Sequence, residues 1–226
     1  NQAWYAIREA QATGGRDKDA DHFLSELAWR EFSYLQLYYF PALPDANMKT
    51  KFDALPWRTD AAALKSWQRG TTGYPIVDAG MRQLWQTGFM HNRIRMVVAS
   101  FLIKNLMIDW RVGQRWFWDC LVDADLASNA AGWQWVAGSG ADAAPFFRVF
   151  NPMLQAIKFD ATGEYIRKFV PELAKLPNEY LFAPWDAPKA VLERYSIVLG
   201  KTYPSPIVNL QASRDRVLGA YRVLPK

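Results

Sequence analysis

The sequence predicts an all-α fold, and three observations support this. Apolar residues recur at intervals of three and four along several stretches of the chain. Alternating apolar and polar runs long enough for strands are missing, and no internal repeat is visible. With 226 residues, of which 50% are hydrophobic, the chain can bury a substantial core.

The predicted helices in the first part of the chain are separated by proline and glycine. Residues 5–12 have the pattern of the end of a helix, and a second helix is expected over about residues 23–35, before Pro41. Pro75 begins another, because proline is favoured in the first turn of a helix. The side chains of that helix expected to face inward are Ile76, Val77, Met81, Leu84 and Trp85.

A glycine then separates this helix from a long one, expected from Asn92 to about Ile108. Two further helices are expected to begin near Val112 and Asp125. Frequent prolines then divide the chain into short pieces. The helical pattern returns over residues 187–199 and 209–224.

The composition excludes some classes of protein. The net charge of +5 permits a polyanionic partner but does not demand one. The single cysteine, Cys120, excludes a disulfide framework and favours a reducing compartment. No membrane association is expected, because the longest apolar run, residues 96–108, is interrupted by Lys104. No metal site is expected either, because His22 and His91 lack ligand partners at metal spacing.

One charged residue stands out within an apolar helix. Asn92, Arg95 and Met96 share one face of that helix. Arg95 needs a partner there, because an unpaired buried cation is very costly. Asp123 and Asp125 are the candidates, and by sequence alone a structural ion pair is the plainer interpretation.

Several short segments, half of which contain tryptophan, carry a family resemblance. They are ELAWREF (26–32), KFDALPW (51–57), TGYPIVD (72–78), MHNRIRM (90–96), LVDAD (121–125) and NAAGWQW (129–135). In this order and spacing they resemble the flavin-binding catalytic domain of DNA photolyases and cryptochromes, from about Phe23 to Tyr221. Residues 74–80 and 117–125 are especially similar to plant cryptochromes, which suggests the bacterial class III photolyases.

The resemblance implies FAD as the cofactor. Asp123 and Asp125 match aspartates beside the flavin, and Arg95 matches the arginine that pairs with the first of them. Asn129 matches the residue that faces flavin N5, which is Asn in photolyases, Asp in plant cryptochromes and Cys in animal cryptochromes. The residues expected to bind the cofactor are Phe23, Arg30, Asn92, Arg95, Asp123, Ala124, Asp125 and Asn129.

The resemblance also implies a pocket for damaged DNA. Trp29 and Trp135 match its aromatic wall, although most tryptophans in proteins are core residues. The residues expected to bind substrate are Glu26, Trp29, Arg30, Asn92, Arg93, Met96, Trp135 and Gln155. The cations that could contact phosphates are Arg30, Arg93, Lys104, Arg148, Arg167 and Lys168.

Three tryptophans resemble the family's electron-transfer relay. Trp133, Trp110 and Trp57 match its members from the flavin outward, and Trp57, in a proline-flanked loop, is the expected surface end. Together with Asn129 they are the expected catalytic residues. Core packing is the alternative, and without the resemblance it is the stronger interpretation.

These matches imply light-driven repair of cyclobutane pyrimidine dimers. The (6-4) photolyases place two histidines where this chain has His91 and Asn92, so the cyclobutane dimer is the expected substrate. A cryptochrome photoreceptor with the same fold is the alternative, and Asn129 weighs against it. An all-helical DNA-binding module without catalysis has only the mild basic charge in its favour.

The resemblance also sets the expected domain organisation. Residues 1–226 match the C-terminal portion of the helical catalytic domain, and the family's N-terminal antenna domain and flavin-phosphate loop do not occur in this sequence. The expected partners are therefore ultraviolet-damaged DNA and the remaining N-terminal part of the same protein. That part is expected to hold a second, antenna chromophore, and the bacterial cytoplasm is the expected location.

Overall fold

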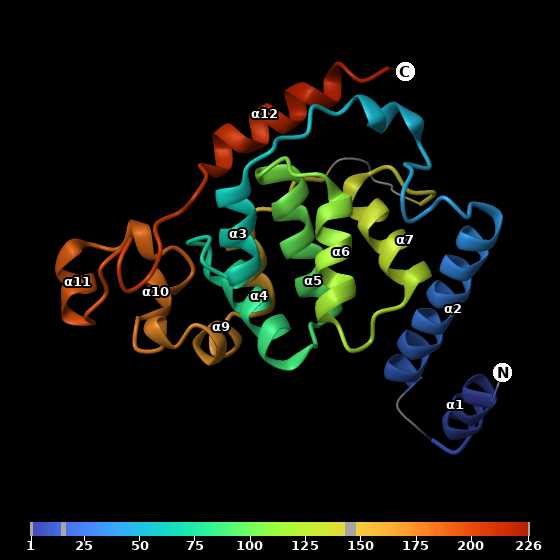
Figure 1. The fold of residues 1–226 in the computed structure, drawn as a ribbon. Helices are drawn as coiled ribbons and strands as arrows, with labels where there is room; N and C mark the ends of the chain where they lie inside the picture. The colour runs from blue at the N-terminus through green and yellow to red at the C-terminus, as the bar shows by residue number, and fades with distance from the viewer. Residues whose placement is uncertain (1, 15–16, 143–147, 226) are drawn as a thin grey trace.

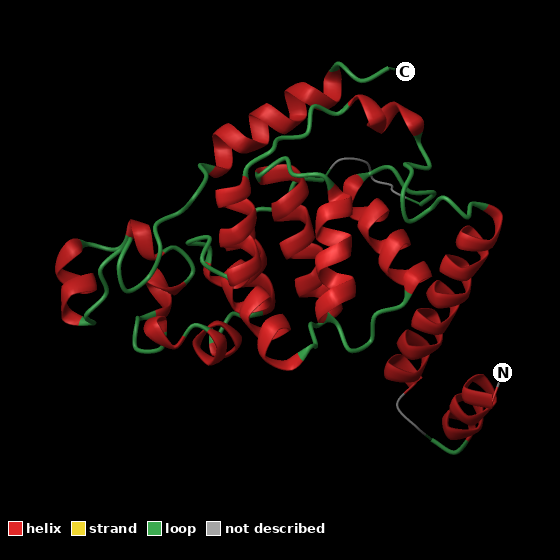
Figure 2. Cartoon of the chain, in the orientation of Figure 1, coloured by secondary structure: helices red, strands yellow, loops and turns green. Residues whose placement is uncertain are grey.

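The structure, a computed structural model, describes residues 2–14, 17–142 and 148–225, and in these it is all-helical (Figures 1 and 2). Twelve α-helices and a few shorter helical turns are present, and no strand is found in the described residues. The nearest approach to β structure among them is an isolated bridge between Leu199 and Tyr203. The predicted all-α fold is confirmed.

Two helices lie along one side of the molecule (Figure 1). They are α1 (Gln2–Ala12) and α2 (Asp17–Tyr39). Helix α2 packs against α7 (Leu126–Ala137), and Leu24 and Ser33 are the buried residues in its described part. Most of the α2 surface is therefore open, although it carries many aromatic residues.

The centre of the molecule is a group of helices whose ends match the sequence signals. They are α3 (Ala61–Arg69), α4 (Pro75–Thr87), α5 (Asn92–Ser100), α6 (Trp110–Cys120) and α7. Asp60, Asp109 and Asp125 cap α3, α6 and α7 by accepting backbone N–H groups, which otherwise lack partners at a helix start. Gly88 ends α4 with a positive φ of 67°, a conformation that glycine adopts at little cost.

The core lies between these helices and includes most of the α4 side chains predicted to face inward. Trp85 is an exception: its side chain is 71% exposed. The ring stacks on Trp116 of α6, with centroids 5.8 Å apart and planes 6° from parallel. The stacking partner on α6 thus holds Trp85 at the surface, and the prediction that it faces the core was wrong.

The prediction of one long helix over residues 92–108 was also wrong, in the second half of that range. Helix α5 ends at Ser100 and continues as a π-helical turn, η2 (Phe101–Asn105). There the Leu106 N–H donates to the Phe101 carbonyl, five residues back, and Met107 adopts a positive φ of 54°. The wider turn ends the helix and buries the side chains of Lys104 and Asn105.

The C-terminal third consists of short elements and one long helix. They are α8 (Pro152–Phe159), α9 (Glu164–Phe169), η3 (Pro171–Leu173), α10 (Asn178–Leu181), η4 (Pro184–Asp186), α11 (Lys189–Arg194) and α12 (Leu210–Arg222). The helix predicted over residues 187–199 is limited to α11, because Ser196 takes a positive φ of 58°.

Helix α12 crosses one end of the central helices, above the segment that holds η1 (Thr50–Ala54) (Figure 1). A small second cluster joins them, formed by Phe52, Leu55, Met107 and Val217. None of the described helices is both long enough and apolar enough to span a lipid bilayer.

Candidate functional site

Arg95 and Asp123 form an ion pair at the open edge between α5 and the start of α7. The Arg95 Nη2 donates to both carboxylate oxygens of Asp123, at 3.0 and 2.8 Å. Its Nε donates to the Met90 carbonyl at 2.7 Å, which fixes the guanidinium in place. The side chains are 26% and 50% exposed, so the pair faces a surface rather than the core. Of the two candidate partners for Arg95, Asp123 is the one that binds it.

Asp125 has a different partner, Tyr34, which no sequence pattern indicated. The Tyr34 hydroxyl on α2 donates to Asp125 at 2.6 Å, and the Ser128 N–H donates to it at 2.8 Å as the cap of α7. Burial raises the pKa of Asp125, but these hydrogen bonds outweigh it and hold the pKa below its usual value. Asp125 is thus an ionised link between α2 and α7.

Asn129 lies one turn into α7, half-buried. Its Nδ2 donates to the backbone carbonyl of Gln114 on α6 at 3.0 Å. This contact fixes the plane of the amide and leaves its oxygen as an acceptor. The side-chain Oε1 of Gln114 is itself buried without a hydrogen-bond partner among the described residues. Ala124, also expected in the site, is half-buried in the connection before α7 and packs against the core.

Trp29 and Trp135, expected in the substrate wall, and Phe23, expected to bind the cofactor, lie on the surface of the packed pair α2 and α7. Phe23 and Trp29 on α2 are 47% and 48% exposed, and Trp135 on α7 is 37% exposed. The Trp29 ring contacts Phe32, 38% exposed, with centroids 5.7 Å apart, and a contiguous exposed apolar surface marks a candidate binding site. Glu26 lies on the same helix, 3.8 Å from His22, and Arg30 pairs with the adjacent Glu31 at 2.9 Å.

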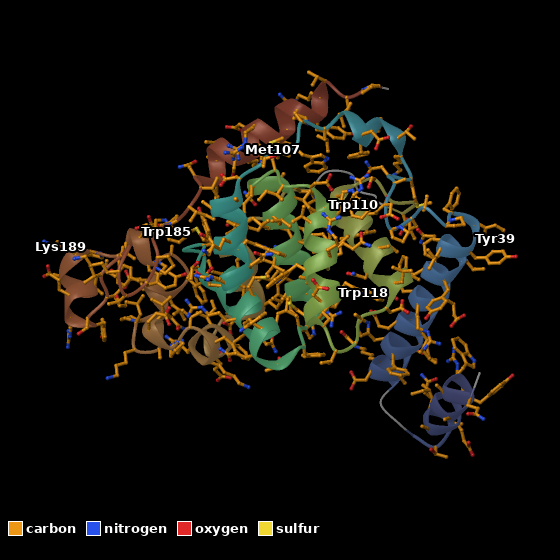
Figure 3. All side chains as sticks on the ribbon, viewed as in Figure 1. Tyr39, Met107, Trp110, Trp118, Trp185 and Lys189 are labelled. Carbon is orange, nitrogen blue, oxygen red and sulfur yellow. The ribbon has the colours of Figure 1, made fainter. Side chains whose placement is uncertain are left out.

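The three tryptophans of the expected relay lie deeper. Trp110 is fully buried and Trp133 is 3% exposed, while Trp57 is half-buried in the loop before α3. Figure 3 shows Trp110 inside the fold, at the start of α6. The Trp133 ring contacts Phe117, with centroids 4.9 Å apart, and Trp67, with centroids 6.3 Å apart. Trp57, expected at the surface end, is the most exposed of the three.

Gly113 is the residue that makes room for Trp133. A Cβ atom at this position would lie 2.1 Å from Cη2 of the indole, far inside contact distance. The ring therefore packs directly on the backbone of α6. Trp110 is held by a hydrogen bond from its Nε1 to Oδ1 of Asn47, at 2.9 Å. No sequence signal indicated the partners Asn47, Phe117 and Trp67, because only the motifs of Trp110 and Trp133 are visible in the sequence.

The structure brings Arg93 and Gln155 together at a separate cavity of about 630 Å³. The cavity lies between the start of α5, the η2 turn, α8 and the start of α12. The Arg93 guanidinium lies over the Phe159 ring, 4.5 Å from its centroid, and its Nη1 is 3.8 Å from Sδ of Met96. Asn92 is exposed beside it at the first position of α5.

Two of the cations grouped as phosphate contacts do not fit that role. Lys104 is 4% exposed, and its Nζ donates to the Arg148 carbonyl at 2.7 Å. Burial, and then the charge of Arg148, lower the pKa of Lys104 to about 7. The guanidinium of Arg167 donates to the carbonyls of Thr162, Ala174 and Leu176. Both side chains are committed to the protein, so these two expectations were wrong.

No group of three or more His, Cys, Asp or Glu that could hold a metal occurs within the described ranges. Polar groups at and near the start of α7 are of kinds that can contact a flavin. They comprise a guanidinium paired with a carboxylate, a second carboxylate and a neutral amide, beside exposed aromatic rings. Arg95 would place positive charge and Asn129 a neutral acceptor at such a ring system.

Comparison with known proteins identifies the family. The family described as the FAD binding domain of DNA photolyase matches residues 23–223. The chain belongs to this family. The matched range agrees with the resemblance stated from the sequence motifs, from about residue 23 to 221.

Individual photolyase and cryptochrome relatives agree with this. A deoxyribodipyrimidine photo-lyase of Agrobacterium fabrum is 60% identical over 208 residues, which are 92% of this chain and 43% of that protein. Cryptochrome-2 of Arabidopsis thaliana is 44% identical over 214 residues, 92% of this chain and 35% of that protein. The chain thus spans less than half the length of the curated relatives it matches.

The same holds for solved structures. The crystal structure of a bacterial class III photolyase from Agrobacterium tumefaciens superimposes with a TM-score of 0.93 at 57% identity. The match covers 97% of this chain and 45% of that one. The expected similarity to bacterial class III photolyases is confirmed.

Proposed function

We propose that this chain is the C-terminal portion of the catalytic domain of a deoxyribodipyrimidine photolyase, which binds FAD and repairs cyclobutane pyrimidine dimers in DNA in light. The supporting observation is the division of its tryptophans. Trp29 and Trp135, expected to hold the dimer, are about half and more than one third exposed. Trp110 and Trp133, expected to carry electrons, are buried. Each exposure suits the proposed role.

FAD, when bound, would supply the light absorption and the one-electron chemistry of the reaction. The residues proposed to hold it are Phe23, Arg30, Asn92, Arg95, Asp123, Ala124, Asp125 and Asn129. The Arg95 guanidinium, oriented by Asp123 and by the Met90 carbonyl, would stabilise negative charge beside it. Asn129, oriented by Gln114, would offer a neutral amide oxygen.

The chain's other residues would bind the substrate and move electrons. Trp29 and Trp135 offer exposed rings on which a flipped dimer can stack. Glu26, Asn92, Arg93, Met96 and Gln155 are proposed to complete the DNA-binding surface. Trp57, half-buried, would receive electrons from solution and pass them inward through Trp110 and Trp133.

The proposal includes an N-terminal part of the same protein that lies outside this chain. The open surface of α2 carries Phe23, Trp29, Phe32 and Leu35, all more than one third exposed. An N-terminal part of the same protein, with an antenna chromophore, would cover some of this surface and complete the flavin site. The bacterial cytoplasm, where the DNA lies, is the proposed location.

A cryptochrome photoreceptor is the second candidate, and the 44% identity to a plant cryptochrome is the observation in its favour. A repair assay on the full-length protein separates the two. We expect a flavin absorption spectrum, and loss of dimers from an oligonucleotide under blue light but not in the dark. Bound flavin with no repair under either condition would instead support the photoreceptor.

A further inference from the structure

Two arginines from distant parts of the sequence are anchored close together where α12 crosses the η2 turn. The backbone N–H of Arg58 donates to the Met107 carbonyl at 2.7 Å. The guanidinium of Arg216 donates to the Asn105 carbonyl, also at 2.7 Å. The two acceptors are only two residues apart in the chain, so the loop before α3 and helix α12 meet at this point. Burial, and then the charge of Arg58, lower the pKa of Arg216, which agrees with this proximity.

Trp57 belongs to the same contact region. It directly precedes Arg58, and its half-buried side chain packs against the second hydrophobic cluster. That cluster contains Met107 and Val217, and Val217 directly follows Arg216 in α12 (Figure 3 labels Met107 beside this helix). The partly exposed indole of Trp57 therefore lies at a surface that both arginines border.

A third cation lies on the other side of the cluster. Nζ of Lys51 is 5.9 Å from the ring centroid of Tyr221, and Tyr221 packs against the same cluster. Lys51 and Arg216 form no ion pair with a carboxylate in the described part of the chain. Their positive charge is therefore available to a ligand at this surface.

The neighbouring carboxylates neutralise this charge only in part. Asp60 pairs with Arg58 at 3.5 Å, and the two side chains are 31% and 43% exposed, so solvent weakens the pair. Asp53 accepts a hydrogen bond from Asn47 at 2.7 Å. Three cations against two carboxylates leave the surface positive, and the chain as a whole has a net charge of +5.

We infer that this surface, formed by Lys51, Trp57, Arg58 and Arg216 and called the Trp57 surface below, binds small anionic one-electron reductants. The inference rests on the proposed relay, in which Trp57 is the member nearest to solution. After Trp57 has given an electron to oxidised Trp110, the reductant supplies one electron to the Trp57 radical cation. Trp57 returns to neutral indole, the reductant is oxidised by one electron, and no covalent bond forms or breaks.

The cations would act by raising the local concentration of the anion. A charge acts over a Debye length of about 8 Å at physiological salt, so cations bordering Trp57 attract an anion to the indole edge. Electron transfer needs only an encounter at that edge, and an open surface suffices for it. A neutral reductant gains nothing from these charges, so the Trp57 surface would select its donor by charge.

The test measures how fast oxidised Trp57 is reduced after a light flash, in the full-length protein carrying FAD. The probes are ferrocyanide, which is a tetraanion, and hydroquinone, which is neutral. We expect the second-order rate constant for ferrocyanide to fall at least about threefold between roughly 20 mM and 200 mM salt, while the constant for hydroquinone stays the same. An equal salt dependence for the two probes would overturn the inference.

Two variants and a matched control locate the effect. Arg216→Gln and Arg58→Gln should each lower the ferrocyanide rate constant about two- to threefold at low salt and leave the hydroquinone constant unchanged. Lys189→Gln removes a 90% exposed cation on α11, on the far side of the fold in Figure 3, and should change neither constant. Arg58→Gln alone decides the matter if Arg216→Gln, which loses an anchor of α12, does not fold.

The results that would overturn the inference differ from those that test the proposed function. An unchanged ferrocyanide constant in Arg58→Gln, or an equal loss for both probes, would overturn the anionic site while leaving the relay intact. If light produces no oxidised Trp57, the relay and the anionic site are both overturned. Dimer repair by chemically reduced protein needs neither, so failure of that repair would disprove the photolyase function separately.

Discussion

The indole nitrogen of Trp110 donates a hydrogen bond to Oδ1 of Asn47 at 2.9 Å, and both side chains are buried. The Nδ2 of Asn47 in turn donates to Asp53 at 2.7 Å. An amide oxygen is a very weak base, so it can orient the indole N–H without removing its proton. If Trp110 is oxidised in the proposed relay, it should therefore remain a protonated cation.

Trp110→Phe should slow the photoreduction of oxidised flavin in the full-length protein at least tenfold. Phenylalanine keeps most of the packing but is much harder to oxidise than tryptophan. Chemically reduced protein should still repair dimers. Flash photolysis measures the first effect, and Trp185→Phe, on the far side of the fold in Figure 3, is the matched control. Photoreduction at the wild-type rate would show that the relay does not use Trp110.

Asp123→Asn should lower flavin affinity roughly tenfold or shift the reduced flavin away from its anionic form. The reason is that Arg95 loses a charged partner that accepts two hydrogen bonds. Flavin content after dialysis and the absorption spectrum of the reduced protein report the change. Glu172→Gln breaks a comparable pair with Arg82, whose contact is 2.8 Å, and should leave the flavin unaffected. Equal flavin retention and equal spectra in both variants would contradict the assignment.

Trp29→Ala should weaken binding of dimer-containing DNA by one to two decades and leave undamaged DNA unaffected. The loss corresponds to a stacking contribution of roughly 1–3 kcal/mol, which the phosphate contacts do not share. Damaged and undamaged duplexes of equal length, compared at one ionic strength, separate the two effects.

Trp118→Ala is the control for this comparison, because Trp118 on α6 is 49% exposed and Trp29 is 48% exposed. Its removal should change neither affinity. An equal loss on both duplexes in Trp29→Ala would indicate a structural role for Trp29. No loss on either duplex would place the substrate pocket elsewhere and favour the photoreceptor.

The burial of Lys104 should make stability depend on pH. Its folded-state pKa, about 7, lies below the usual value of 10.5. Between these two values the unfolded chain binds more protons than the folded one, so the free energy of unfolding should rise with pH across this window. The contribution approaches about 1.4 kcal/mol per pH unit in the middle of the window.

Lys104→Met should remove this part of the pH dependence, and Lys201→Met, at an exposed site, should preserve it. Chemical denaturation of the full-length protein at pH 7 and pH 9 compares the slopes. Identical slopes in the wild type and Lys104→Met would show that Lys104 is not buried as the structure has it.

Local sequence signals were sufficient to predict much of the fold. The spacing of apolar residues, with Pro75 at one helix start and Asp125 at another, predicted α4 and α7, because capping and periodicity depend on a few neighbouring residues. The motifs around Asn92 and Asn129 were sufficient to identify the family, since their order and spacing are properties of the sequence itself.

Other features depend on contacts between distant segments, which only the tertiary structure decides. Two aspartates could have paired with Arg95, and the packing of α2 on α7 brought Tyr34 to Asp125 and left Asp123 for the arginine. Stacking on Trp116 likewise placed Trp85 at the surface, against the periodicity of its helix. The surroundings of Asn105 could not be predicted from the sequence either. The π-helical turn that buries it and the cations that line its cavity lie on separate elements. Periodicity within one helix determines which face is apolar, but the identity of the residue opposite each side chain is determined by how the helices pack.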